Sequence, residues 1–103
     1  MTAASLLTGL DSVHPGEILR EDVLPALGRP KAEIARLLGT SRQSLYDLLA
    51  ERQGVTVPMA LRLGKLCGNG AQFWISLQNA YDMRRAETEL ASQLAGIPTL
   101  TAA

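Results

Sequence analysis

The sequence predicts an all-α protein with a helix-turn-helix at its centre. The composition is rich in Leu and Ala and only 4% aromatic, which favours helices over strands. Apolar residues recur at helical spacing, and glycines or prolines separate the segments. With 103 residues the chain has room for one domain with a single core. We therefore expect five helices, an N-terminal arm and a C-terminal extension.

The first thirteen residues are expected to form an extended arm. They mix small and polar residues with three leucines, Leu6, Leu7 and Leu10. Chain ends that are not tied down by packing are usually poorly ordered. The expected organisation is an arm at 1–13, a helix-turn-helix domain at 14–87, and a helical extension and tail at 88–103.

The first helix is expected to begin at Pro15 and to stop at Pro25 and Gly28. Proline suits the first helical position because that position needs no N–H donor. His14 then falls at the helix cap. It is the only histidine, and no cluster of Cys, Asp or Glu stands at ligand spacing, so neither a metal site nor another cofactor is expected.

Residues 31–48 carry the pattern of the helix-turn-helix itself. Pro30 is expected to open the second helix, Gly39 to end it through a positive φ, and Thr40 or Ser41 to cap the third. Ala35 is small where the two helices must approach each other. The residues expected to face the core are Ile34, Ala35, Leu37 and Leu38 in the second helix and Leu45, Leu48 and Leu49 in the third.

Gly54 is expected to end the third helix, and Thr56 to cap a fourth that runs to Gly68. The apolar residues of this fourth helix recur at helical spacing; they are Met59, Ala60, Leu63, Leu66 and Cys67. A lone cysteine has no intrachain disulfide partner, so we expect Cys67 to act as a small buried apolar residue.

A fifth helix is expected after Gly68-Asn69-Gly70, with no stop before Gly96 and Pro98. Its apolar stripe continues beyond the length that a small core uses, through Met83, Ala86, Leu90, Leu94 and Ile97. Two explanations remain open. The stripe contacts another chain, or the helix folds back on its own domain.

Charge is distributed unevenly, although the net charge is zero. Residues 1–28 contain one Arg against four Asp or Glu, whereas residues 29–70 contain seven Lys or Arg against three Asp or Glu. A basic segment that coincides with a helix-turn-helix indicates nucleic-acid binding, because cationic side chains displace the counterions of DNA. The alternative is that these charges only solvate helix faces.

The candidate DNA-binding residues cluster at the start of the second and third helices: Lys31, Thr40, Ser41, Arg42, Gln43, Ser44, Tyr46 and Asp47. Recognition helices touch base edges with their first turns. Arg can bind guanine and Gln can bind adenine through paired hydrogen bonds, so Arg42 and Gln43 have the chemistry of direct base recognition. Lys31 and Ser41 are expected at phosphates, and Tyr46 at a thymine methyl or a phosphate. Asp47 is expected to orient Arg42 or Gln43.

Four ordered motifs carry a resemblance to a known family. They are His14-Pro15-Gly16-Glu17-Ile18-Leu19, Ser41-Arg42-Gln43, Met59-Ala60-Leu61-Arg62-Leu63, and Phe73-Trp74 followed by Leu77-Gln78 and Tyr81-Asp82. Over residues 13–87 the chain resembles the HigA-type antitoxins, which are Xre/lambda-repressor-like helix-turn-helix regulators. Gly70 and Ala71 stand where relatives have Ser and Pro, which weakens the last helix cap. Residues 89–103 match no family motif.

The resemblance implies a five-helix lambda-repressor-like fold and two partners. As a homodimer the protein would bind a palindromic operator in its own promoter and repress the operon. It would also neutralise a small RelE-type (HigB-like) toxin that cleaves messenger RNA. The alternative is a free-standing Xre-type regulator without a toxin. Candidate toxin surfaces are the arm, the final helix, and the acidic residues Glu17, Glu21 and Asp22, since such toxins are commonly basic.

The sequence also excludes several classes of protein. One His, one Cys and no glycine-rich phosphate loop or carboxylate cluster leave no machinery for an enzyme. No apolar run approaches the roughly 20 residues that span a bilayer, and no basic segment precedes an apolar one at the N-terminus. We therefore expect a cytoplasmic protein with no membrane partner.

Overall fold

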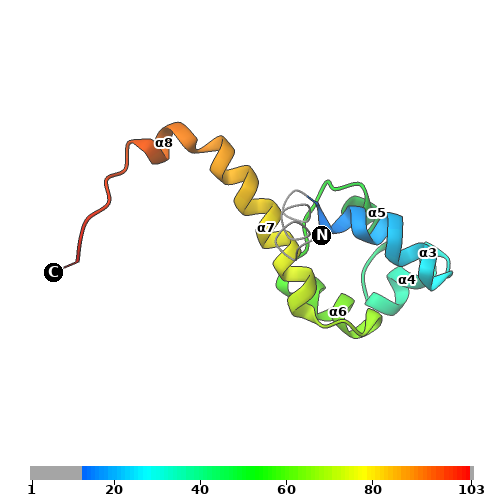
Figure 1. Ribbon diagram of the computed structural model, residues 1–103. Coiled ribbons are helices and arrows are strands. Elements are labelled where there is room, and N and C mark those ends of the chain that lie inside the picture. The colour runs from blue at the N-terminus through cyan, green and yellow to red at the C-terminus, as the bar shows by residue number, and fades with distance from the viewer. Residues whose placement is uncertain (1–12, 103) are drawn as a thin grey trace, which may run out of the picture.

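The computed structural model describes residues 13–102, and all regular structure in this range is helical (Figure 1). The all-α fold class is confirmed. The expected arm, apart from Val13, lies outside the described residues. The elements are α2 (Pro15–Ile18), η1 (Leu19–Val23), α3 (Leu24–Leu27), α4 (Lys31–Leu38), α5 (Arg42–Leu49), α6 (Val57–Cys67), α7 (Ala71–Glu89) and α8 (Ala91–Ala95).

The first three segments form one continuous helix, so the expected stop at Pro25 is wrong. Segment η1 is a π-helical turn in which the Leu24 N–H donates to the Leu19 carbonyl, five residues back. This extra residue widens the turn just before Pro25, which accommodates the proline ring and its missing N–H. Gly28, the other expected stop, ends the helix at φ 65°, and this part of the prediction is confirmed. At the other end His14 is the cap, as expected, because its Nδ1 accepts the Gly16 N–H at 2.9 Å.

Helices α4 and α5 form the helix-turn-helix. Gly39 ends α4 at φ 71°, and Ser41 caps α5 by accepting the Ser44 N–H at 3.0 Å. Ser41 rather than Thr40 is thus the cap. All the residues expected to face the core are buried except Leu37, which is 47% exposed. The expectation for Leu37 is wrong because it lies at the outer edge of α4, beside α6.

The third helix ends at Leu49 and not at Gly54. A turn follows in which Glu51 takes a left-handed φ of 62°. Gly54 instead lies against α7, where a Cβ atom would come 2.7 Å from the Gln78 side chain. The Oε1 of buried Gln78 accepts the Val55 N–H at 2.7 Å. This bond ties the loop to α7.

The core lies between the first helix, the helix-turn-helix, α6 and the first half of α7. Trp74 is fully buried, and its Nε1 donates to Asn69 Oδ1 at 2.9 Å. Thr56 and Gly68 delimit α6 as expected, while Gly70 offers no side-chain cap to α7. Cys67 is half-buried and packs against the core, and burial raises the pKa of its thiol. Its expected packing role is confirmed.

We call residues 13–82, which contain the core, the body. The C-terminal arm, defined as residues 83–102, projects from the body (Figure 1). Helix α7 ends at Glu89, and Leu90 interrupts it with a non-helical φ of −101° and ψ of 6° before α8 begins. The expectation of one helix to Gly96 is therefore wrong. Met83, Leu94 and Ile97 stay exposed, so the arm does not fold back on its own domain. Within residues 13–102 no helix is long and apolar enough to cross a membrane.

Candidate nucleic-acid interface

The first two turns of α5 present most of the predicted DNA-binding residues. Arg42, Gln43 and Tyr46 are exposed on this helix, and Lys31 lies beside them at the start of α4, with its Nζ 5.8 Å from the Tyr46 ring centre. We call these four residues and their helix face the α5 surface. Thr40 is half-buried in the turn, and Ser44 is half-buried behind the Ser41 cap. Seven of the eight predicted residues thus lie in α5 and the turn before it, and the eighth, Lys31, lies beside Tyr46.

Helix α5 is held rigidly from behind by the first helix. A Cβ atom on Gly16 would lie 2.0 Å from the Leu48 carbonyl oxygen, so only glycine permits this approach. Arg20 Nη1 donates to the Leu49 carbonyl at 2.6 Å, which satisfies the C-terminal end of α5. Arg20 also pairs with Glu21 at 2.9 Å and with Glu51 at 3.4 Å. The α5 surface is therefore displayed on a fixed support.

Asp47 joins two side chains on the outer side of α5. Its Oδ1 accepts hydrogen bonds from Gln43 Nε2 at 2.9 Å and from Arg52 Nε at 3.0 Å, and forms an ion pair with Arg52, whose Nη2 lies 2.9 Å away. The hydrogen bond from Arg52, followed by that from Gln43, lowers the pKa of this carboxyl group. Of the two partners expected for Asp47, the structure pairs it with Gln43. Arg42 has no ion pair within the described part of the chain.

Three residues near the α5 surface escaped the sequence analysis. Arg52 reaches Asp47, Gln53 Nε2 donates to the Ser44 carbonyl at 3.1 Å, and Arg62 Nη1 donates to the Gly39 carbonyl at 3.1 Å. Arg52 and Arg62 contribute to the basic excess of residues 29–70, which was the only signal available for them. Their contacts depend on how loops and helices fold back on one another.

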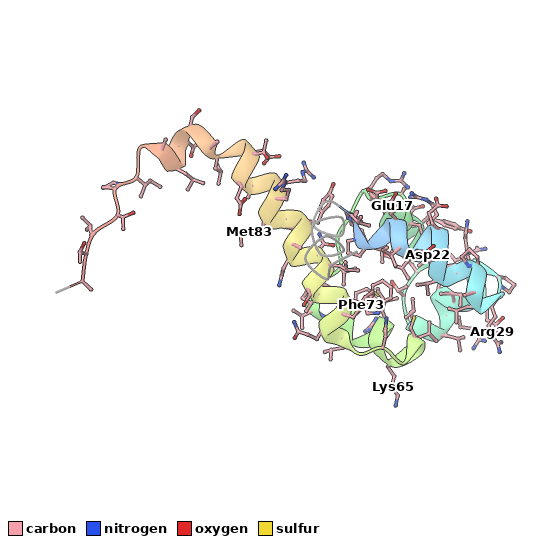
Figure 2. The ribbon with its side chains drawn as sticks, viewed as in Figure 1. Glu17, Asp22, Arg29, Lys65, Phe73 and Met83 are labelled. Carbon is pink, nitrogen blue, oxygen red and sulfur yellow. The ribbon has the colours of Figure 1, made fainter. Side chains whose placement is uncertain are left out.

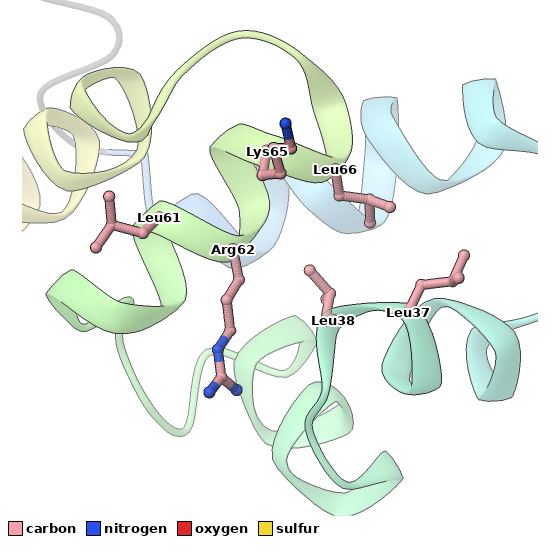
Figure 3. A pocket seen from close by; sticks show the side chains of 6 residues that line it. All are labelled: Leu37, Leu38, Leu61, Arg62, Lys65 and Leu66. Carbon is pink, nitrogen blue, oxygen red and sulfur yellow. The ribbon is translucent and has the colours of Figure 1, made fainter.

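Arg62 also lines a pocket of about 360 Å³ between α6 and α4, the first helix of the helix-turn-helix (Figure 3). The other lining residues are Leu37, Leu38, Leu61, Lys65 and Leu66. Figure 3 shows the Arg62 side chain extending from α6 toward the turn after α4. Because its guanidinium binds the turn that precedes α5, Arg62 connects α6 to the helix-turn-helix.

The first helix, which packs against α5, carries acidic residues. Glu17, Glu21 and Asp22 are exposed there. In Figure 2, Glu17 and Asp22 lie along one edge of the molecule, whereas Lys65 projects from the opposite edge. Arg20, on the same helix, is also exposed and pairs with Glu21. Within the described residues, Glu17 and Asp22 are therefore the acidic residues of this helix that form no ion pair.

Comparison with known proteins identifies the family. Virulence-associated protein I of Dichelobacter nodosus is 37% identical over 92 residues, which cover 89% of this chain and 85% of that protein. Antitoxin GraA in complex with its operator is 40% identical, with a TM-score of 0.81 over 87% of this chain and 92% of that one. Pseudomonas aeruginosa antitoxin HigA with the higBA promoter is 35% identical, with the same TM-score over 87% and 99%. The chain belongs to the HigA antitoxin family.

No protein-family model matches the chain. HigA-type antitoxins are helix-turn-helix regulators and not enzymes, so the expected absence of catalysis is confirmed by the relatives. The motifs quoted from the sequence lie within the body. The match to virulence-associated protein I spans 92 residues, so it continues past position 88 into the C-terminal arm.

Proposed function

We propose that the protein represses its own operon by inserting the start of α5 into the major groove of an operator. The observation that carries this proposal is the pair Arg42 and Gln43, exposed side by side on the first turn of a capped and rigidly supported helix. These two side chains can bind guanine and adenine edges, respectively, and Lys31 lies where it can meet a phosphate. Operator complexes of GraA and HigA support the proposal. Binding to the cell's own DNA also implies a cytoplasmic protein.

The operator is proposed to be palindromic and the protein to bind it as a homodimer. One helix-turn-helix reads only a few base pairs, and two half-sites about 34 Å apart supply the remaining specificity. The exposed apolar residues of the C-terminal arm offer a surface for self-association. A monomer in sedimentation measurements at concentrations that bind DNA would contradict this proposal.

The second partner is proposed to be a small RelE-type (HigB-like) ribonuclease, which the protein neutralises. Membership in an antitoxin family supports this role. The acidic residues Glu17, Glu21 and Asp22 form the candidate contact, because a basic ribonuclease is attracted to a surface of opposite charge. Replacing all three by lysine should weaken binding of the toxin but not of DNA. Unchanged toxin affinity would exclude this surface.

The α5 surface is tested by gel shift and competition with random DNA. Arg42→Ala should weaken operator binding by about 1 to 3 kcal/mol and relax the preference at one base pair per half-site. Lys31→Ala should weaken binding to all sequences similarly. Arg85→Ala, which removes an exposed ion pair on α7, is the matched control. Because Arg85 lies in the C-terminal arm, it is compared at a concentration where sedimentation shows wild type and variants equally associated. Equal losses on operator and random DNA for Arg42→Ala would refute its role in recognition.

Co-expression with the reading frame next to this gene tests both partners together. An antitoxin should protect cells from that product, co-purify with it and shift the promoter fragment. A neighbouring product that is harmless when expressed alone, combined with a promoter shift, would identify a free-standing regulator instead.

A further inference from the structure

We propose that Asp47 positions Gln43 for base recognition and that Arg52 is a further residue that contacts DNA. Oδ1 of Asp47 holds both of these side chains in place. Asp47 Oδ1 accepts hydrogen bonds from the Gln43 amide and from the Arg52 guanidinium. The three side chains come from the first turn of α5, its second turn and the loop that follows it. This inference rests on the proposed binding of operator DNA by α5.

The bond from Gln43 fixes the orientation of its amide. Nε2 donates one of its two N–H groups to Asp47, so the second N–H and Oε1 remain available to a base. Rotating the amide by half a turn would bring Oε1 against Oδ1 of Asp47, and two acceptors repel each other. The order of donor and acceptor along the helix is therefore fixed. An adenine edge requires such an ordered pair, because its N7 accepts and its N6 donates.

Arg52 is held in a position from which it can bind phosphate. Its Nε and Nη2 are directed at Asp47, which leaves Nη1 with both of its N–H groups available. The side chain is 61% exposed. The positive charge of Arg52 also offsets the negative charge of the Asp47 carboxylate, and this reduces the repulsion between that carboxylate and a DNA phosphate.

The loop after α5 is itself fixed against the helix, so the position of Arg52 is structurally defined. The Arg52 N–H donates to the Asp47 carbonyl at 2.8 Å, and Gln53 Nε2 donates to the Ser44 carbonyl at 3.1 Å. The left-handed conformation of Glu51 turns the chain back toward α5. Arg52 is therefore placed along the outer side of α5 by both its backbone and its side chain.

The experiment selects DNA duplexes from a random pool and reads their sequences, so no operator needs to be known. Wild type should select an adenine on one strand at the position that Gln43 reads. Asp47→Ala and Asp47→Leu remove the acceptor of the Gln43 bond and should reduce that preference about tenfold while leaving the preference due to Arg42 unchanged. Asp47→Asn keeps an acceptor oxygen and should retain most of the preference. A purely structural role of Asp47 would weaken both preferences together.

The variants Gln43→Ala and Gln43→Ala/Asp47→Ala test whether Asp47 acts through Gln43. If it does, removing Asp47 causes no further loss of preference once Gln43 is absent. Additive losses in the double variant would overturn the positioning role. A preference at this position that survives Asp47→Leu, which has no acceptor, would also overturn it.

Arg52 is tested through the salt dependence of binding. Arg52→Ala should weaken binding to all duplexes and lower the slope of log affinity against log salt by about one. Arg85→Ala is the control, since this arginine also forms an ion pair and is 62% exposed. Because Arg85 lies in the C-terminal arm, both variants are compared at a concentration where sedimentation shows them equally associated. Equal slopes for the two variants would exclude Arg52 from the interface. If the wild-type protein selects no sequence, the proposed function is wrong as well. If the wild type selects a sequence but the variants at Asp47 and Arg52 bind as the wild type does, only this inference is wrong.

Discussion

The body and the C-terminal arm of this protein differ in where their apolar residues lie. In the body, leucines such as Leu48 and Leu63 are fully buried, and close contacts between helices depend on Gly16 and Gly64. In the arm, Leu94 and Ile97 are about half or more exposed and no residue is buried. The body is therefore stabilised by contacts within one chain, whereas the arm needs a partner to bury its apolar surface.

This difference implies a separation of roles. Substitutions in the body should change the free energy of unfolding, and matched substitutions in the arm should not. Substitutions in the arm should instead change association between chains. Paired variants, one in each region, test this expectation.

The largest effect is expected from Gly16→Ala paired with Gly96→Ala. At position 16 the new Cβ would lie 2.0 Å from the Leu48 carbonyl oxygen, so α2 and α5 must separate, at a cost of about 3 kcal/mol or more. At position 96 the nearest atom to the new Cβ is the Gln93 carbonyl oxygen at 3.4 Å, and the change should stay within about 0.5 kcal/mol. Urea denaturation measures both. Similar losses at the two positions would contradict the proposed contrast.

A smaller effect is expected from Gln78→Leu paired with Gln93→Leu. Leucine at position 78 leaves the buried N–H of Val55 without its acceptor, which should lower the free energy of unfolding by about 2 kcal/mol. Gln93 is exposed in α8, so its replacement should change little. If amide hydrogen exchange at Val55 is as slow in Gln78→Leu as in wild type, the Gln78 bond does not hold the loop.

A third effect, dependent on pH, is expected only in the body. Burial of His14 lowers its pKa, with Arg85 acting in the same direction and Glu51 and Asp82 opposing it. Its ring also packs edge-on against Tyr81, with centroids 4.9 Å apart. Because the unfolded chain binds a proton more readily, stability should be complete above about pH 6.5 and should fall as the pH drops through the folded pKa.

Denaturation of wild type and His14→Asn between pH 7.5 and 5 measures this effect. Asparagine retains the ability to cap α2 but does not titrate, so the variant should lose the slope that His14 contributes. Since His14 is the only histidine, no other side chain of that type contributes in this window. Identical pH profiles for the two proteins would exclude His14 as the source.

The contrast between body and arm also separates what the sequence could predict from what it could not. The cap at Thr56 was predictable, and the cap at Ser41 was predictable to within one residue, because a cap side chain bonds to a backbone N–H three residues away. The ends at Gly39 and Gly68 followed from their need for positive φ. These features are local, and so was the motif that placed Arg42 and Gln43 at the start of α5.

Contacts between distant segments were not predictable in the same way. The bond from Val55 to Gln78 spans 23 residues. The ion pair of Asp47 with Arg52 requires a left-handed turn at Glu51, and no glycine stands there to indicate such a turn in the sequence. The π-helical turn before Pro25 was also missed, because the sequence analysis took this proline as a stop. In the arm, the interruption at Leu90 has no Gly or Pro to mark it, so periodicity alone predicted a continuous helix.

The smallest effect on unfolding, and the one that tests the comparison most directly, is expected from Leu94→Asp. Leu94 is 48% exposed, so the free energy of unfolding of one chain should change by less than about 0.5 kcal/mol. If the arm holds two copies together, a buried aspartate at their interface is costly, and the dimer should dissociate at concentrations where wild type remains associated. Sedimentation equilibrium measures the association, and the concentration dependence of the unfolding midpoint should disappear in the variant. A dimer of unchanged affinity would mean that the arm contacts some other partner, and that self-association must be sought on the body.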